Sequence, residues 1–104
     1  MKITVEQRVE MLLSLIPYYS ERQYSGNYYD NDDLNDIHAA IERAGLTDKQ
    51  REALELVYIK DQTYEDAAKL VGVSRVTMLL RTKRAVSLVT AAYDKEKRND
   101  IRRT

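Results

Sequence analysis

The stretch Thr63–Met78 reads TYEDAAKLVGVSRVTM, and the spacing within it decides the fold. Thr63 is the kind of residue that caps a helix N-terminus, so a short helix is expected to follow it. Gly72 comes where that helix should end, because glycine takes a positive φ at no steric cost. Ser74 can cap the next helix, and Ala68 is small enough for two helices to nearly touch. The combination predicts a helix-turn-helix, and an ordinary helical hairpin is the alternative.

The residues around this turn extend the prediction in both directions. The apolar residues spaced to point into the joint between the two helices are Ala67, Val71, Val73 and Met78. No glycine or proline follows Gly72, so the last helix should run from Arg75 past Tyr93. The tail, residues 95–104, is expected to fray.

Two further helix starts are indicated by capping boxes, at residues 4–7 (TVEQ) and 47–50 (TDKQ). The first helix carries its apolar residues on one face, and Pro17 should end or kink it, because proline removes a backbone donor and clashes with the preceding turn. The helix that follows residue 47 should lead through a polar connector at residues 60–62 into the short helix after Thr63.

A tyrosine-rich segment, residues 18–33, lies between the first two helices and holds five of the eight tyrosines. These rings either form a partner-binding patch or pack the loop onto the helices, and packing is the preferred interpretation. Asp32 or Asp33 should cap the second helix, and Gly45 should end it with a left-handed residue. His38, at the edge of its apolar face, is interpreted as a boundary residue rather than a ligand.

The composition is that of a helical protein built as one compact domain. Of 104 residues, 43% are hydrophobic and 33% charged, and one proline and three glycines leave few forced breaks. We predict an all-α bundle of about five helices that contains the helix-turn-helix and a long C-terminal helix. There is no long apolar run, no signal-peptide pattern, no cysteine, a single histidine, no nucleophile–base pair and no glycine-rich phosphate loop. We therefore expect a cytoplasmic protein that is not an enzyme, has no cofactor or metal and does not enter membranes.

The charges are divided between the two parts of the chain. Residues 1–72 carry 8 Lys and Arg against 14 Asp and Glu, a net charge of −6, and residues 73–104 carry 9 against 3, a net charge of +6. The basic part can neutralise phosphates, and the acidic part is expected to face away from them.

A longer pattern surrounds the turn. It comprises residues 46–56 (LTDKQREALEL), 64–68 (YEDAA) and 72–75 (GVSR), followed by Arg81, Arg84 and Ala85. This pattern covers roughly half the chain and resembles the fourth region of bacterial sigma factors and small phage-encoded transcriptional regulators. The resemblance implies a four-helix, all-α domain whose helix beginning at Arg75 enters the DNA major groove.

The resemblance also implies roles for individual residues. Arg75 matches a base-reading arginine, and Arg81 and Arg84 match basic positions that pack on or approach the DNA backbone. Tyr64 stands where it would touch a phosphate. Thr77 stands where many helix-turn-helix proteins present a small side chain to the groove.

Other positions in the last helix depart from the family pattern. Val76, Leu79 and Leu80 replace small or polar groove-facing residues. They either contact thymine methyl groups or are buried against another protein surface, for which the first helix and a second subunit are the candidates. Lys83 adds positive charge to the same helix, and Ser74 should leave its hydroxyl near the phosphate backbone.

An apolar band on the last helix is wider than one packing seam. It consists of Met78, Ala85, Val86, Leu88, Val89, Ala92 and Tyr93. Either the first helix covers this band, or two copies of the chain pair through it and present two recognition helices. Thr82 stands in this helix where the family pattern has an apolar core residue.

We therefore divide the chain into an N-terminal helical extension (1–45), which is a candidate partner or dimer contact, the helix-turn-helix module (46–94) and the basic tail (95–104). The expected function is that of a sequence-specific DNA-binding transcription regulator from a phage or mobile element. The extension is too short for the promoter-melting regions of a sigma factor. One alternative is a module that contacts RNA polymerase, a sigma factor or a host regulator without reading DNA. The other is a small terminase-like DNA-packaging protein.

Overall fold

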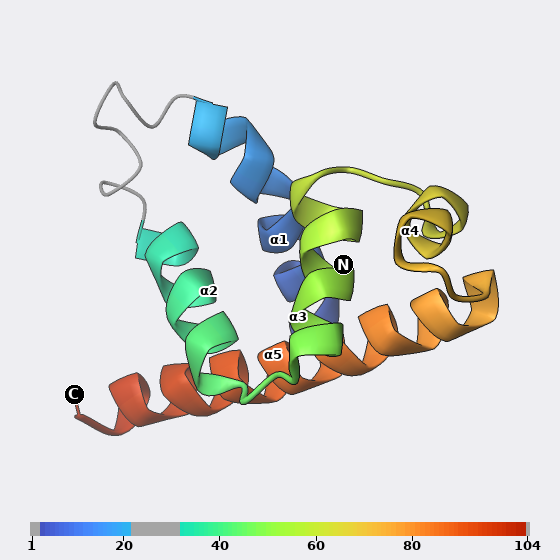
Figure 1. The fold of residues 1–104 in the computed structure, drawn as a ribbon. Coiled ribbons are helices and arrows are strands. Elements are labelled where there is room, and N and C mark those ends of the chain that lie inside the picture. Colours follow the sequence, from blue (N-terminus) through green and yellow to red (C-terminus); the bar gives the residue numbers. More distant parts are fainter. Residues whose placement is uncertain (1–2, 22–31, 104) are drawn as a thin grey trace.

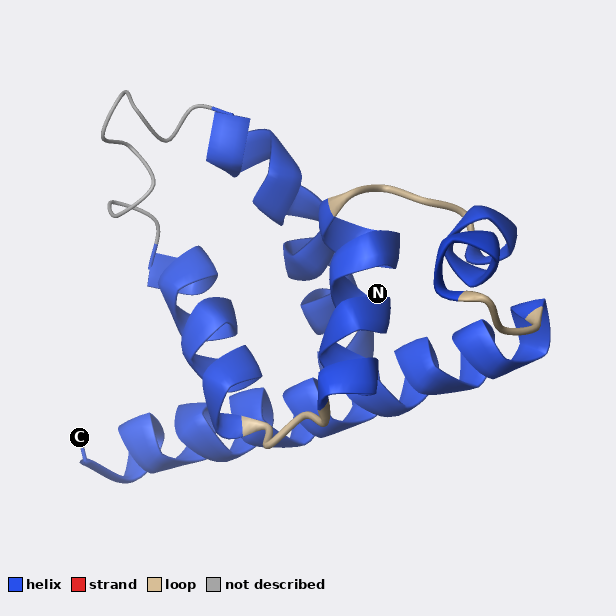
Figure 2. Ribbon diagram, in the orientation of Figure 1, coloured by secondary structure: helices blue, strands red, loops and turns tan. Residues whose placement is uncertain are grey.

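The computed structural model describes residues 3–21 and 32–103, and all regular structure in this part of the chain is helical (Figures 1 and 2). The helices are α1 (Val5–Glu21), α2 (Asp32–Arg43), α3 (Asp48–Leu54), α4 (Tyr64–Val71) and α5 (Arg75–Arg103), and the π-helical segment η3 (Glu55–Ile59) extends α3. The predicted all-α bundle of about five helices with a long C-terminal helix is confirmed. None of these helices combines the length and apolar content that crossing a bilayer requires.

Both predicted capping boxes form. The backbone N–H of Gln7 donates to Thr4 Oγ1 at 3.1 Å, and that of Thr4 donates to Gln7 Oε1 at 2.9 Å. The same reciprocal pair joins Thr47 and Gln50 at 3.2 and 3.0 Å. Gly45 follows α2 with a φ of 67°, the left-handed conformation predicted for it. Each cap satisfies backbone groups that a helix end leaves unpaired.

Two helix boundaries bear on the predictions, and a third expectation stays untested. Helix α1 continues past Pro17 to Glu21, so of the two predicted effects of Pro17 a helix end is excluded and a kink stays a prediction. Asp32 and Asp33 are already the first two residues of α2, and the position before them lies outside the described part of the chain, so their capping role stays a prediction. The tyrosine-rich segment is also left open, because residues 22–31 lie outside the described residues.

The third helix changes its hydrogen-bond pattern at Glu55. Over η3 the bonds span five residues instead of four: the Lys60 N–H donates to the Glu55 carbonyl at 2.8 Å. Asp61 then adopts a φ of 54°, and the Gln62 N–H donates to the Leu56 carbonyl at 2.9 Å. These bonds close the α3 segment tightly before α4 begins.

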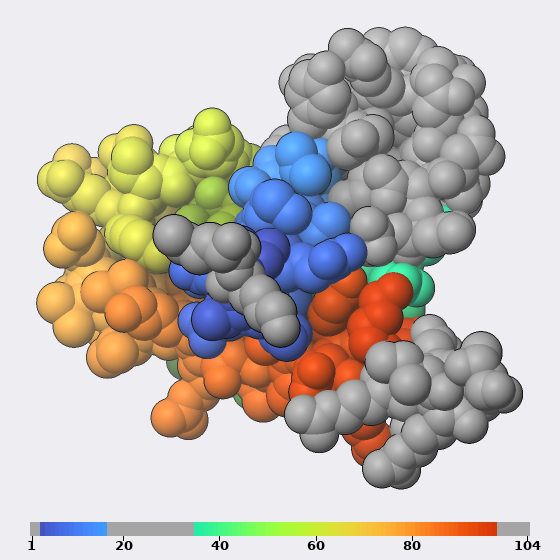
Figure 3. Space-filling model, turned by 180° about the vertical axis from the view of Figure 1, so that it is seen from behind, coloured from blue at the N-terminus to red at the C-terminus, as the bar shows by residue number. Residues whose placement is uncertain are grey.

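Helix α5 is the longest helix and contacts α1, α2, α3 and α4. In Figure 1 it runs along the base of the bundle, with α2 and α3 standing on it and α4 at its N-terminal end; from behind, α1 lies against it (Figure 3). The main core joins α1, α2, α3 and α5, and its members are Val9, Leu12, Leu13, Ile16, Ile37, Ala40, Leu54, Ala85, Val86, Val89 and Tyr93. The apolar band of α5 is therefore covered within the chain, apart from Leu88, which is 37% exposed. That coverage removes the observation from which a homodimer was expected.

The C-terminal part of α5 is held to α2. Glu96 accepts an ion pair from Arg43 at 3.0 Å, and Lys97 Nζ donates to Asp36. Helix α5 continues to Arg103, and the fraying expected of residues 95–104 stays a prediction. His38 on the same α2 is half-buried, and this burial lowers its pKa, against an opposing effect of Glu42.

Candidate nucleic-acid interface

The turn between α4 and α5 has the geometry predicted from its residues. Thr63 Oγ1 accepts from the Asp66 N–H at 3.0 Å and caps α4. Gly72 has a φ of 81°, and its N–H and that of Val73 both donate to the Ala68 carbonyl, at 2.8 and 3.0 Å. Two donors on one carbonyl hold the chain as it reverses from α4 into α5.

The start of α5 is capped by Ser74, whose Oγ accepts from the Thr77 N–H at 3.1 Å. The Ser74 hydroxyl then donates to Thr77 Oγ1 at 2.9 Å. These bonds do not favour the phosphate contact predicted for the Ser74 hydroxyl. Its proton is used inside the turn, and the Thr77 hydroxyl is the one left to donate.

A small core fixes the angle between α4 and α5. Ala53, Ala67, Ala68 and Met78 are buried together, with Val71 and Val73 packed against them. Ala68 is 3% exposed, as expected where two helices meet closely. Thr82 takes an apolar position of the family pattern at 1% exposure, and its hydroxyl donates to the Met78 carbonyl at 2.8 Å, so its burial leaves no unpaired donor.

The outer face of α5 is apolar at its centre. Val76 and Leu80, one turn apart, are 60% and 61% exposed. Leu79 is half-buried at the edge of this face. The suggestion that Val76 and Leu80 are covered by the first helix is wrong, because both are open to solvent.

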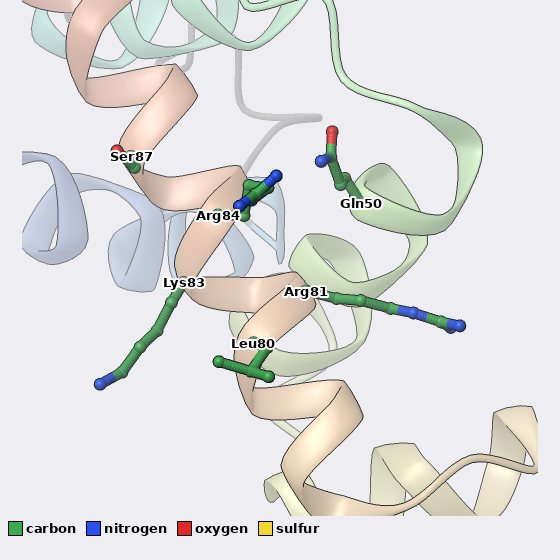
Figure 4. Close-up of a pocket in the computed structure, with 6 residues that line it drawn as sticks. All are labelled: Gln50, Leu80, Arg81, Lys83, Arg84 and Ser87. Carbon is green, nitrogen blue, oxygen red and sulfur yellow. The ribbon is translucent and has the colours of Figure 1, made fainter.

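Basic side chains flank these two residues. Arg81, Lys83 and Arg84 line a groove of about 480 Å³, together with Leu80, Gln50 from α3 and Ser87 (Figure 4). In Figure 4 Leu80 lies between Lys83 on one side and Arg81 on the other. Gln50 and Ser87 were not predicted from the sequence as residues of this site. Ser87 continues the helical spacing of Leu80 and Arg84, whereas Gln50 reaches the groove only through the packing of α3 on α5.

The basic residues of the first part of α5 differ in their pairing from other cations of the described residues. Among the residues that the structure describes, Arg75, Arg81, Lys83 and Arg84 take part in no ion pair, whereas other cations, including Arg51 and Lys69, pair with glutamates. Their charge is available to a polyanion.

Acidic residues border this face on one side. Glu6 and Glu10 of α1 line a pocket of about 130 Å³ with Tyr58, Tyr64 and Lys83 among its other residues. The expectation that the acidic half faces away is therefore wrong for Glu6 and Glu10. Because a phosphate touching Tyr64 would lie near these carboxylates, this placement does not favour the phosphate contact predicted for Tyr64.

The environment of this pocket raises the pKa of Tyr58 to about 12. Burial is the largest cause, and the charges of Glu10, Tyr64 and Glu6 also oppose the phenolate.

We expect Glu10→Gln to lower the pKa of Tyr58 but to leave it above its ordinary value, since burial is the largest cause. Because the folded pKa is raised, the contribution of Tyr58 to stability is complete below pH ~10 and is lost as pH rises towards 12. Ultraviolet difference titration against Tyr58→Phe isolates this phenol. Glu65→Gln, on the exposed side of α4, should leave it unchanged, and an unshifted pKa in Glu10→Gln would disprove the contact.

Among the side chains that the structure describes, those of residues 3–16 and 35–97, no group of three or more His, Cys, Asp or Glu is placed to hold a metal ion. The arrangement presents instead a convex helix with an apolar centre and basic flanks. Such a surface suits the DNA major groove, which is wide enough for a helix and has phosphates along both walls.

Comparison with known proteins assigns a family. Residues 34–88 match the family model described as sigma-70, region 4, which takes in α2, α3, α4 and the first half of α5. The match begins before residue 46, where the sequence pattern had placed the start of the module. No curated protein and no solved structure matches the chain. Since the matched residues make up more than half of the chain, the protein belongs to the sigma-70 region 4 family, whose helix-turn-helix domains generally bind DNA.

Proposed function

We propose that the protein binds double-stranded DNA sequence-specifically and regulates transcription, with the first half of α5 in the major groove. The observation that carries the proposal is the uncovered outer face of α5, where Val76 and Leu80 are flanked by basic residues without acidic partners. We place this activity in the cytoplasm and its gene in a phage or mobile element, the latter on the resemblance to small phage regulators.

The residues have different roles in this proposal. Arg75, Val76, Thr77, Leu79 and Leu80 would face base edges, and Arg81 and Arg84 would contact phosphates. Lys83, which shares a pocket with Glu6 and Glu10, would add positive charge to the same helix. Ser74 would act by holding the turn and orienting Thr77. The support for α1 and α2 as part of one domain is that they share the main core with α5.

Duplex binding measured over a range of salt concentrations tests the proposal. Arg75→Ala should lower affinity for the preferred sequence by about 1–3 kcal/mol and relax specificity at one position. Arg84→Ala should weaken binding to all sequences similarly and reduce the salt slope by about one. Lys95→Ala removes the same charge from an exposed site far along α5 and serves as the control.

Absence of duplex binding even at low salt, with wild type and Arg75→Ala indistinguishable, would contradict the proposal. A protein-contacting role for the same exposed apolar face, towards RNA polymerase or a sigma factor, would then replace it.

A further inference from the structure

Val76 and Leu80 form an apolar pair at the centre of the outer face of α5. They are 60% and 61% exposed, and they stand one helical turn apart on the side opposite the buried Met78, Thr82 and Ala85. Two exposed aliphatic side chains here contribute nothing to the core, because neither belongs to a core cluster. Their exposed position is therefore not explained by packing within the protein, and it indicates contact with a ligand or a partner.

The surroundings of this pair favour DNA over an apolar protein surface. Lys83 and Arg81 lie on either side of Leu80 (Figure 4), and Arg84 also lines the groove. An apolar protein partner would have to bury these unpaired cations, which is costly without acidic partners. In a major groove, by contrast, the cations reach the phosphate walls while the apolar pair reaches the floor.

The floor of the major groove offers one apolar group, the C5-methyl of thymine. Neither Val76 nor Leu80 has a donor or acceptor with which to read any other base edge. Residues four apart on a helix are separated by about 6 Å along its axis, which is close to two base-pair steps of about 3.4 Å.

We infer that Val76 and Leu80 are specificity-determining residues that read thymine methyl groups about two base pairs apart. This inference rests on the proposed DNA binding and adds the chemistry of the recognised site. Each contact buries one methyl group and should contribute about fourfold to affinity, the factor that corresponds to ~0.8 kcal/mol.

The experiment begins with selection of binding sites from a random-sequence duplex library by the full chain. Each thymine of the selected site is then replaced by deoxyuridine, which removes only the methyl group and keeps the base pair. We expect two positions, about two base pairs apart, at which this replacement lowers affinity about fourfold.

Double-mutant cycles between protein and DNA assign the contacts. Val76→Ala should abolish the uridine effect at one of the two positions, and Leu80→Ala at the other. Leu70→Ala on α4, at a leucine of similar exposure (68%), should leave both effects in place.

A failure of thymine-methyl reading and a failure of DNA binding would give different results. If a sequence is selected but uridine replacement has no effect, or the effect persists in both alanine variants, methyl reading is overturned and DNA binding stands. If no sequence is enriched and no duplex is bound, DNA binding itself is overturned, and methyl reading with it.

Discussion

Replacing Leu80 with aspartate should abolish sequence-specific DNA binding while leaving the fold intact. Leu80 is 61% exposed and belongs to no core cluster, so its removal costs little stability. In a groove, however, the new carboxylate would face a wall of phosphates, and like charges brought together at an interface cost several kcal/mol. We expect affinity for the preferred duplex to fall by more than about a hundredfold.

Titration of a labelled duplex measures this loss, and circular dichroism with thermal denaturation checks the fold. Ala91→Asp is the matched control, because it adds the same charge to an exposed position of α5 about 16 Å further along the helix. Equal losses in the two variants would show that the effect is general charge repulsion, and an unchanged affinity in Leu80→Asp would place the interface elsewhere.

The helix-turn-helix was predictable because its determinants are local. Thr63, Gly72 and Ser74 each act on backbone groups within three or four residues, so their spacing in the sequence specifies their geometry. The capping boxes at Thr4 and Thr47 were predictable for the same reason. The solvent exposure of Val76 and Leu80 was not predictable in this way, because the sequence left open whether another surface covers them.

Features that depend on packing between distant segments were not predictable. The π-helical segment Glu55–Ile59 has no sequence signature of its own, and Gln50 enters the groove only because α3 lies against α5. Likewise, net charge indicated an acidic N-terminal half but not that Glu6 and Glu10 lie beside Lys83.

The surface that covers the apolar band on α5 was also not predictable from the sequence. A wide apolar band on one helix indicates that it packs against another surface. It does not indicate whether that surface belongs to another helix of the same chain or to a second chain. The structure supplies the cover from α1, through Val9, Leu12, Leu13 and Ile16, together with α2 and α3, through Ile37, Ala40 and Leu54. A second copy is therefore not needed to bury α5, and the role of α1 becomes testable as a question of stability.

Leu13→Ala should destabilise the whole protein, because Leu13 is fully buried in the core shared by α1, α2, α3 and α5. Leucine-to-alanine changes at such sites cost about 2.7–5 kcal/mol, a large part of the 5–15 kcal/mol that is typical of a domain. If α1 folds with the module, urea denaturation should show one transition shifted to lower urea for helix content and for tyrosine fluorescence alike. Met11→Ala, at a 49% exposed position of the same helix, should shift the urea midpoint by a small fraction of this amount.

The contrary outcome is that Leu13→Ala leaves the main transition in place and removes only a minor transition at low urea. In that case α1 would be a separable extension, and the domain would fold without it. A single large shift would show that α1 is an integral part of the domain, because its apolar residues share one core with Val86 and Val89 of α5.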